Sequence, residues 1–170
     1  MSEDTNVIDF ERRAAQARAM HTGYLITELD GPTLKGIFDA AFIDARVDED
    51  GDCIVRDDMT LWTMADPAKD VFKVYAFFPT AGTREQALEF CNRFNLRLVI
   101  VRAQVRDTPD SDGQWTVIFD YDRLVFEDER LEARTIVKTV RRFEAPGWWH
   151  ALCGAVPTGG RLPTAWWALR

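Results

Sequence analysis

The sequence has few of the residues that most often build catalytic and metal sites. It contains only two histidines, His21 and His150, and three cysteines, Cys53, Cys91 and Cys153, which lie far apart in the chain. No CxxC pair occurs, so neither a disulfide framework nor a zinc site is indicated. We therefore expect no bound metal.

Nucleophile and phosphate-binding motifs are also absent from the sequence. Ser2 and Ser111 are the only serines, and Ser111 lies in an acidic turn rather than in a G-x-S-x-G motif. There is no P-loop and no G-x-G-x-x-G motif, and the glycines at "TGGR" only predict flexibility. We expect no catalytic residues, no cofactor and no enzymatic activity.

The chain lacks both an excess of positive charge and a long apolar run. Its formal net charge is −7 and its sequence pI is about 4.9. An acidic balance disfavours nucleic acid and anionic membranes, and no run approaches the ~20 apolar residues of a membrane span. The first ten residues, "MSEDTNVIDF", are acidic and have no apolar core, so they do not resemble a secretory signal. We expect a cytoplasmic protein.

The hydrophobic pattern predicts an α+β fold. Helical spacing covers residues 32–43, 83–95 and 129–143, and in the first of these helices we expect one buried face. That face consists of Leu34, Ile37, Phe38, Ala41 and Phe42. Strand-like alternation predicts about five antiparallel strands, with helices packed on the sheet, in the order α-β-β-β-α-β-β-α. The expected strands are 45–47, 53–64, 71–79, 97–105 and 114–126.

Composition divides the chain into three parts. Residues 1–24 are expected to form an N-terminal lead or a short helix, and residues 25–145 the α+β domain. Residues 146–170 are interrupted by Pro and Gly and are rich in tryptophan. We expect this C-terminal tail to pack on the domain or on a partner.

Three features of the sequence resemble the YbjN family of bacterial proteins. They are the "DEDGDCIV" hairpin, the helix end "EFCNRFN" with its N-x-x-N pair Asn92 and Asn95, and the long hairpin that follows. The resemblance covers roughly residues 31–143. It implies a fold like that of type III secretion chaperones, a role as a candidate sensory transduction regulator, and a homodimer. It implies no catalytic residue.

The two asparagines have a structural and a functional interpretation. Asn tolerates the left-handed conformation that closes helices, so Asn95 fits the position after the second helix. The amide of Asn92, one turn earlier, can donate and accept, and so can tie the helix end to the next strand. The functional alternative is a polar contact in a binding groove.

Two surfaces are candidates for contact with a partner. On the outer face of the long hairpin, Arg102, Gln104 and Arg106 are predicted to lie opposite Thr116, Ile118 and Asp120, next to Leu98 and Ile100. This face predicts either a half-solvated sheet with cross-strand ion pairs or a surface for a polypeptide. The second surface comprises Trp148, Trp149, Trp166 and Trp167, which either pack on the domain or recruit a partner.

The spacing of Asp48, Asp50 and Asp52 around Gly51 resembles part of a calcium-binding loop. However, strand patterns flank them and no closing Glu stands where an EF-hand requires one, so a solvated hairpin turn is favoured. The leading hypothesis is therefore a non-enzymatic adaptor, chaperone or regulator that binds a protein or peptide. The alternative is an enzyme or small-ligand-binding domain whose site is not visible in the sequence.

Overall fold

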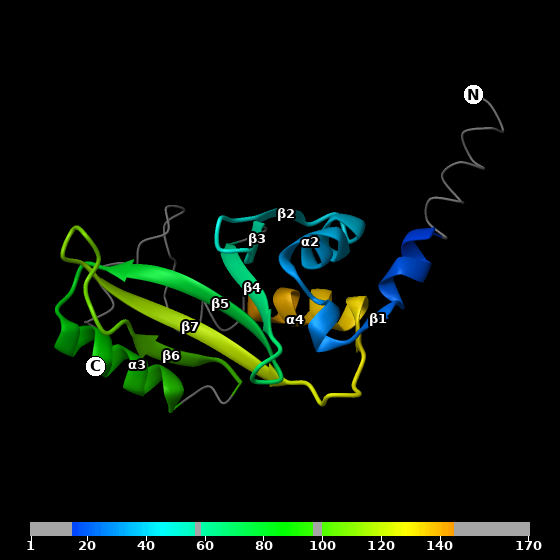
Figure 1. Ribbon diagram of the computed structural model, residues 1–170. Coiled ribbons are helices and arrows are strands. Elements are labelled where there is room, and N and C mark those ends of the chain that lie inside the picture. The colour runs from blue at the N-terminus through cyan, green and yellow to red at the C-terminus, as the bar shows by residue number, and fades with distance from the viewer. Residues whose placement is uncertain (1–14, 57–58, 97–99, 145–170) are drawn as a thin grey trace, which may run out of the picture. The chain divides into compact units, whose positions relative to one another are not determined.

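The computed structural model describes residues 15–56, 59–96 and 100–144 (Figure 1). After a helical segment at 15–20, its helices are the 3-10 helix η1 (Ile26–Glu28), α2 (Gly31–Ala40), α3 (Arg84–Asn95) and α4 (Ala133–Glu144). Its strands are β1 (Gly23–Tyr24), β2 (Asp44–Val47), β3 (Cys53–Arg56), β4 (Thr60–Asp66), β5 (Val71–Thr80), β6 (Arg102–Val105), β7 (Trp115–Leu124) and β8 (Leu131–Glu132).

Six of these strands form one sheet in the order β2-β3-β4-β5-β7-β6, and β1 pairs with β8 in a separate two-stranded sheet. The α+β class and the antiparallel sheet are confirmed, but the sheet has six strands rather than five. The described residues divide into two compact units: those of 15–73 with 123–141, and those of 74–122 with 142–144. Strands β2 and β6 are the two ends of the strand order.

The extra strand arises because residues 53–64 do not form one continuous strand. They form β3 and β4, which pair antiparallel with Val55 opposite Leu61 and Arg56 opposite Thr60. Asp has a low strand propensity, so the Asp-Asp pair at 57–58 favours a break at this point. The alternation predicted for the apolar positions persists, because Cys53, Val55 and Leu61 are all fully buried.

Helix α2 begins as its sequence predicts. Asp30 is the N-cap, its carboxylate accepts the backbone N–H of Thr33 at 2.8 Å, and Pro32 lies in the first turn. Leu34, Ile37 and Phe38 are buried, as expected of one apolar face. This face packs on β2, β3 and β4 in the first unit.

The prediction that Phe42 is buried is wrong. The helix ends at Ala40, and Phe42 has a backbone φ of 58°, in the left-handed region. Its side chain is consequently 71% exposed. The helical period determines side-chain direction only as far as the last helical residue. Because the helix ends before Phe42, that residue does not lie on the buried face to which the apolar pattern assigns it.

The third predicted helix begins later than the pattern indicates. Leu131 and Glu132 form β8, which pairs with β1, and the backbone N–H of Ala133 donates to the carbonyl of Thr22 at 2.9 Å. The N-terminal segment therefore contributes a strand to the first unit. The helix buries one apolar face at helical spacing, made of Ala133, Ile136, Val137, Val140 and Phe143.

The second unit is built around an aromatic cluster. The ring of Phe119 lies 4.8 Å from that of Phe94, 5.4 Å from that of Phe78 and 6.0 Å from that of Phe90, measured between centroids. These edge-to-face contacts join β5, α3 and β7. A capping box opens α3: the N–H of Thr83 donates to Gln86 Oε1 at 2.8 Å, and the N–H of Gln86 donates to Thr83 Oγ1 at 3.4 Å.

The same turn closes the β2–β3 and β6–β7 hairpins. Asp48 Oδ1 accepts the backbone N–H groups of the residues two and four positions later, at 3.1 and 2.9 Å. Asp110 Oδ1 does the same at 3.0 and 2.8 Å. In both turns a glycine with positive φ, Gly51 at 88° and Gly113 at 74°, stands three residues after the aspartate. Each aspartate therefore holds its turn with its own carboxylate.

Candidate functional site

Asn95 joins the end of α3 to strand β6. Its side-chain Nδ2 donates to the carbonyl oxygen of Ala103 at 2.9 Å, and its Oδ1 accepts the backbone N–H of Ala103 at 2.8 Å. One amide side chain thus satisfies both backbone groups of one strand residue, as a neighbouring strand would. This pair of bonds holds together the two ends of the connection between α3 and β6.

The roles expected of the two asparagines have to be corrected. Asn95 is the last helical residue rather than a left-handed residue after the helix, and the C-cap Leu96 has ordinary helical angles, φ −70° and ψ −20°. The tie to the incoming strand, expected of Asn92, is made by Asn95. Asn92 is exposed, and its backbone carbonyl accepts the backbone N–H of Leu96 at 3.1 Å.

The Asn95 side chain occupies the outer edge of β6. The N–H of Arg106 donates to the carbonyl of Thr116 at 2.9 Å, so the backbone groups of Gln104 and Arg102 also point toward β7. Those of Ala103 point away from β7, where Asn95 pairs with them. A second chain therefore cannot bond to Ala103 without displacing Asn95, which protects this end of the sheet.

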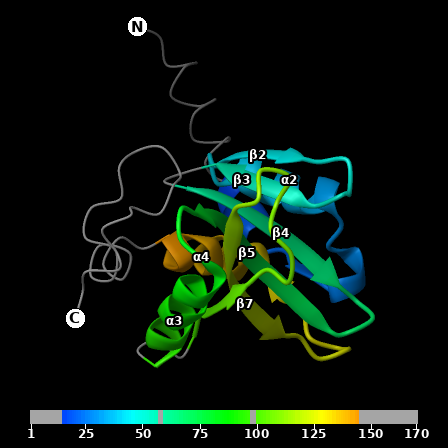
Figure 2. The same ribbon diagram turned by 90° about the vertical axis from the view of Figure 1, so that its left-hand side faces the viewer.

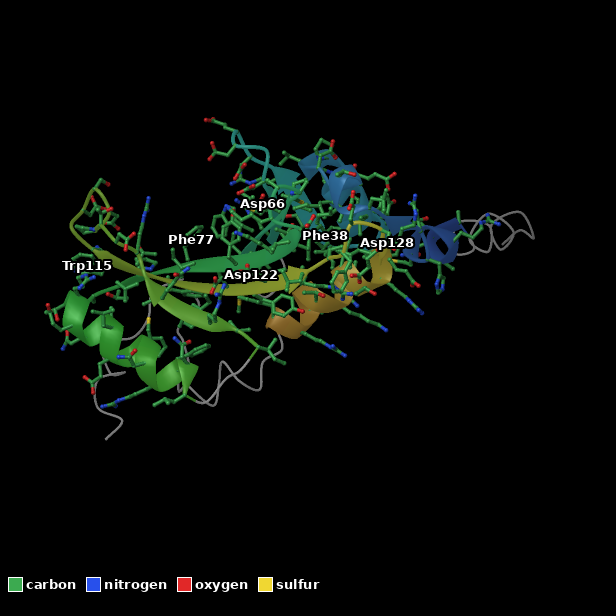
Figure 3. The ribbon with its side chains drawn as sticks, turned by 60° about the horizontal axis from the view of Figure 1, so that its bottom comes forward. Phe38, Asp66, Phe77, Trp115, Asp122 and Asp128 are labelled. Atoms are coloured by element: carbon green, nitrogen blue, oxygen red, sulfur yellow. The ribbon has the colours of Figure 1, made fainter. Side chains whose placement is uncertain are left out.

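The outer face of the β6–β7 hairpin has the predicted register. Arg102 lies opposite Asp120 and Gln104 opposite Ile118. The guanidinium of Arg102 lies 2.8 Å from Asp120 and 2.6 Å from Asp122, which Figure 3 labels on β7. The Arg102 side chain is 62% exposed, so the charges neutralise one another on a solvated surface. Its donors are directed at its own sheet.

Trp115 marks the other end of this hairpin. It begins β7 beside the start of α3, and the guanidinium carbon of Arg84 lies 5.6 Å from the centre of its ring (Figure 3). A cation over an aromatic face at this distance is a favourable contact. Besides the contacts of Phe119, the hairpin is thus attached to α3 near both ends of the helix, through Arg84 and through Asn95.

Two large apolar side chains flank the α3–β6 connection and are strongly exposed. Leu96 is 87% exposed and Ile100 is 73% exposed. Ile100 was expected on the candidate surface, whereas Leu96 was not. The signal for Leu96 was its position directly after the last helical residue, two residues past Phe94 at the end of the buried stripe. Ile118, also expected there, is half-buried on β7.

Several sequence candidates lie outside the described residues. They are Leu98 and the four tryptophans of the C-terminal tail, Trp148, Trp149, Trp166 and Trp167. No described helix is both long enough and apolar enough to span a membrane. Within the described residues no group of three or more His, Cys, Asp or Glu side chains could hold a metal ion.

Both cysteines among the described residues are buried and have the properties of unreactive thiols. Burial in apolar surroundings raises the pKa of the Cys53 thiol to about 11 and that of Cys91 to about 12. The fully buried hydroxyl of Thr63 donates to the carbonyl of Cys53 at 3.1 Å, within the β3–β4 pair. Neither thiol has the lowered pKa and exposure of a nucleophile.

A solved structure with a similar fold agrees with the family resemblance. The crystal structure of YbjN, a candidate transcription regulator from E. coli, superposes with a TM-score of 0.51 at 11% sequence identity. The match covers 66% of this chain and 82% of that one. No family model and no curated protein sequence matches this chain. The fold is therefore YbjN-like, and at this identity the likeness concerns the fold alone.

Proposed function

We propose that this protein is a non-enzymatic adaptor or regulator that binds a polypeptide partner. The observation that carries the proposal is the exposure of Leu96 and Ile100 on either side of the α3–β6 connection. Strongly exposed large apolar side chains that are neighbours in the chain are a candidate interaction site. YbjN, whose fold is similar, is itself described as a candidate regulator.

The surroundings of these side chains suit a binding surface. Asn95 fixes the base of the connection through its two bonds to Ala103, so Leu96 and Ile100 flank a connection whose ends are held. A surface fixed before binding loses less conformational entropy when a partner docks. The neighbouring Arg102 contributes little free charge, because Asp120 and Asp122 neutralise it. We therefore expect apolar contacts to dominate the affinity.

The mode of contact differs from strand addition beside β6. Because Asn95 already pairs with Ala103, an extended peptide has no free backbone groups at the centre of that edge. The partner instead contacts side chains: Leu96 and Ile100, with Ile118 and Gln104 on the adjoining face. The tryptophan-rich tail belongs to this proposal only as a second contact region.

The proposal can be tested with a library of displayed peptides panned on the purified full-length protein. Enriched peptides are synthesised with a fluorophore, and their affinity is measured by anisotropy. The double variant Leu96→Asp/Ile100→Asp is expected to weaken binding at least about tenfold, because it puts charge into an apolar contact. Circular dichroism and melting curves verify that the variant remains folded.

A matched control uses Leu124→Asp/Phe126→Asp. These residues are 70% and 73% exposed, close to the exposure of the tested pair, but they belong to the first unit. This variant is expected to bind the peptides as the wild type does. Equal binding by the Leu96/Ile100 variant contradicts the proposed surface. Robust turnover in a broad hydrolase and transferase screen contradicts the non-enzyme assignment and favours the alternative of a hidden active site.

A further inference from the structure

Strand β2 has an open edge, unlike β6 at the other end of the strand order. The N–H of Asp48 donates to the carbonyl of Asp52 at 3.0 Å, which fixes the alternation of hydrogen bonds along β2 and β3. The backbone groups of Arg46 and Asp44 then point toward β3, and those of Ala45 and Val47 point outward. Among the described residues, none bonds to these outward groups.

The ribbon diagrams agree with the hydrogen-bond pattern in placing β2 at an edge of its unit. In both, β2 lies at the rim of its unit, with α2 and β3 on its inner side and no other described element of that unit along its outer side (Figures 1 and 2). An exposed edge of this kind is a template for another strand. Asn95 protects β6, whereas no side chain among the described residues bonds to the outer edge of β2 in a comparable way.

The side chains of β2 carry charges of opposite sign at alternate positions. Asp44 and Arg46 are exposed, and within the described part of the chain neither forms an ion pair with another residue. Ala45 between them is buried, so the two charged side chains share the opposite face of the strand. The pattern is self-complementary: when the strand is reversed about Ala45, each charge meets its opposite.

We propose that a second copy of this chain pairs antiparallel with β2, about a two-fold axis at Ala45. Ala45 then exchanges two backbone hydrogen bonds with Ala45 of the second copy, since the free groups of both point outward. Asp44 lies opposite Arg46 of the second copy, and Arg46 opposite its Asp44. Opposite charges directly across an antiparallel pair are stabilising. The two copies thus continue one antiparallel sheet.

The charges select this register over its neighbours. An axis at Arg46 would place Arg46 opposite its own copy, and an axis at Asp44 would do the same for Asp44. Like charges directly opposite are destabilising. The interface is independent of the peptide-binding surface, which lies in the other unit.

The test is sedimentation equilibrium of the full-length chain over a wide concentration series. The wild type is expected to dimerise. Arg46→Asp and Asp44→Arg should each weaken the dimer at least about tenfold, because each turns two attractive pairs into two repulsive ones. The exchange variant Asp44→Arg/Arg46→Asp should dimerise like the wild type, and an equimolar mixture of the two single variants should form a heterodimer.

Lys138→Glu is the control, because it changes the net charge by the same amount as Arg46→Asp at an exposed position of α4. It should leave dimerisation unchanged. A wild type that stays monomeric at every concentration overturns the proposal. Single variants that dimerise as well as the wild type also overturn it. The same holds if the exchange variant and the mixture of single variants are folded but both remain monomeric.

Discussion

Gly31, the first residue of α2, packs directly against Gly51 in the β2–β3 turn. A Cβ added to Gly31 would lie 2.3 Å from the carbonyl oxygen of Gly51 and 2.9 Å from a methyl carbon of Val47. The backbone of the turn and the half-buried Val47 cannot both retreat by that amount. The start of the helix and the hairpin turn therefore fit together only because this position has no side chain.

Gly31→Ala is expected to lower the free energy of unfolding by roughly 1–3 kcal/mol, the usual cost of overpacking. Gly36→Ala in the same helix provides the control, because no described residue lies within 4 Å of a Cβ at that position. That variant should raise stability by roughly 0.5–1 kcal/mol, since alanine loses less backbone entropy than glycine in a helix. Urea denaturation of both variants measures the two changes. If both have the same sign, the proposed packing of Gly31 on Gly51 is wrong.

Asn95→Ala is expected to lower the free energy of unfolding by roughly 1–2 kcal/mol, because it removes two hydrogen bonds to the backbone of Ala103. Asn95→Asp should recover only part of this loss, because a carboxylate accepts the Ala103 N–H but repels its carbonyl. Asn92→Ala, at an exposed position, should change stability by less than ~0.5 kcal/mol. Denaturant titrations of the three variants establish the ranking. An Asn95→Ala variant with wild-type stability but lost peptide binding would instead assign this residue to the binding surface.

The buried thiols should resist modification. In a Cys153→Ser variant, Cys53 and Cys91 are expected to react with a disulfide reagent at pH 8 only as fast as the protein opens. Burial raises their pKa values to about 11 and about 12, so both stay protonated there. In the unfolded chain the pKa values are lower, and both thiols should react at once in urea. The absorbance of the released thiolate follows the reaction, and fast labelling of native protein would show that one of them is accessible.

The sequence by itself determined the local elements. Asp30 and Thr83 mark helix starts through their own hydrogen bonds, and the register of the β6–β7 hairpin follows from alternation along two strands. The family resemblance agrees with the observed fold. These features depend on residues within a few positions of one another, or on a period that a single strand or helix imposes.

The tertiary structure decided which side chains remain exposed and how the strands are ordered. Phe42 and Leu96 have the hydrophobicity of core residues, but each follows a helix end, where the chain turns them outward. Strand β5 neighbours β7 rather than β6, so β6 becomes an edge. That edge gives Asn95 its role, because its partner Ala103 is brought to it by folding. The hydrophobic pattern of the sequence cannot predict this pairing of Asn95 with Ala103. The pairing depends on which backbone groups of the folded sheet have no neighbouring strand.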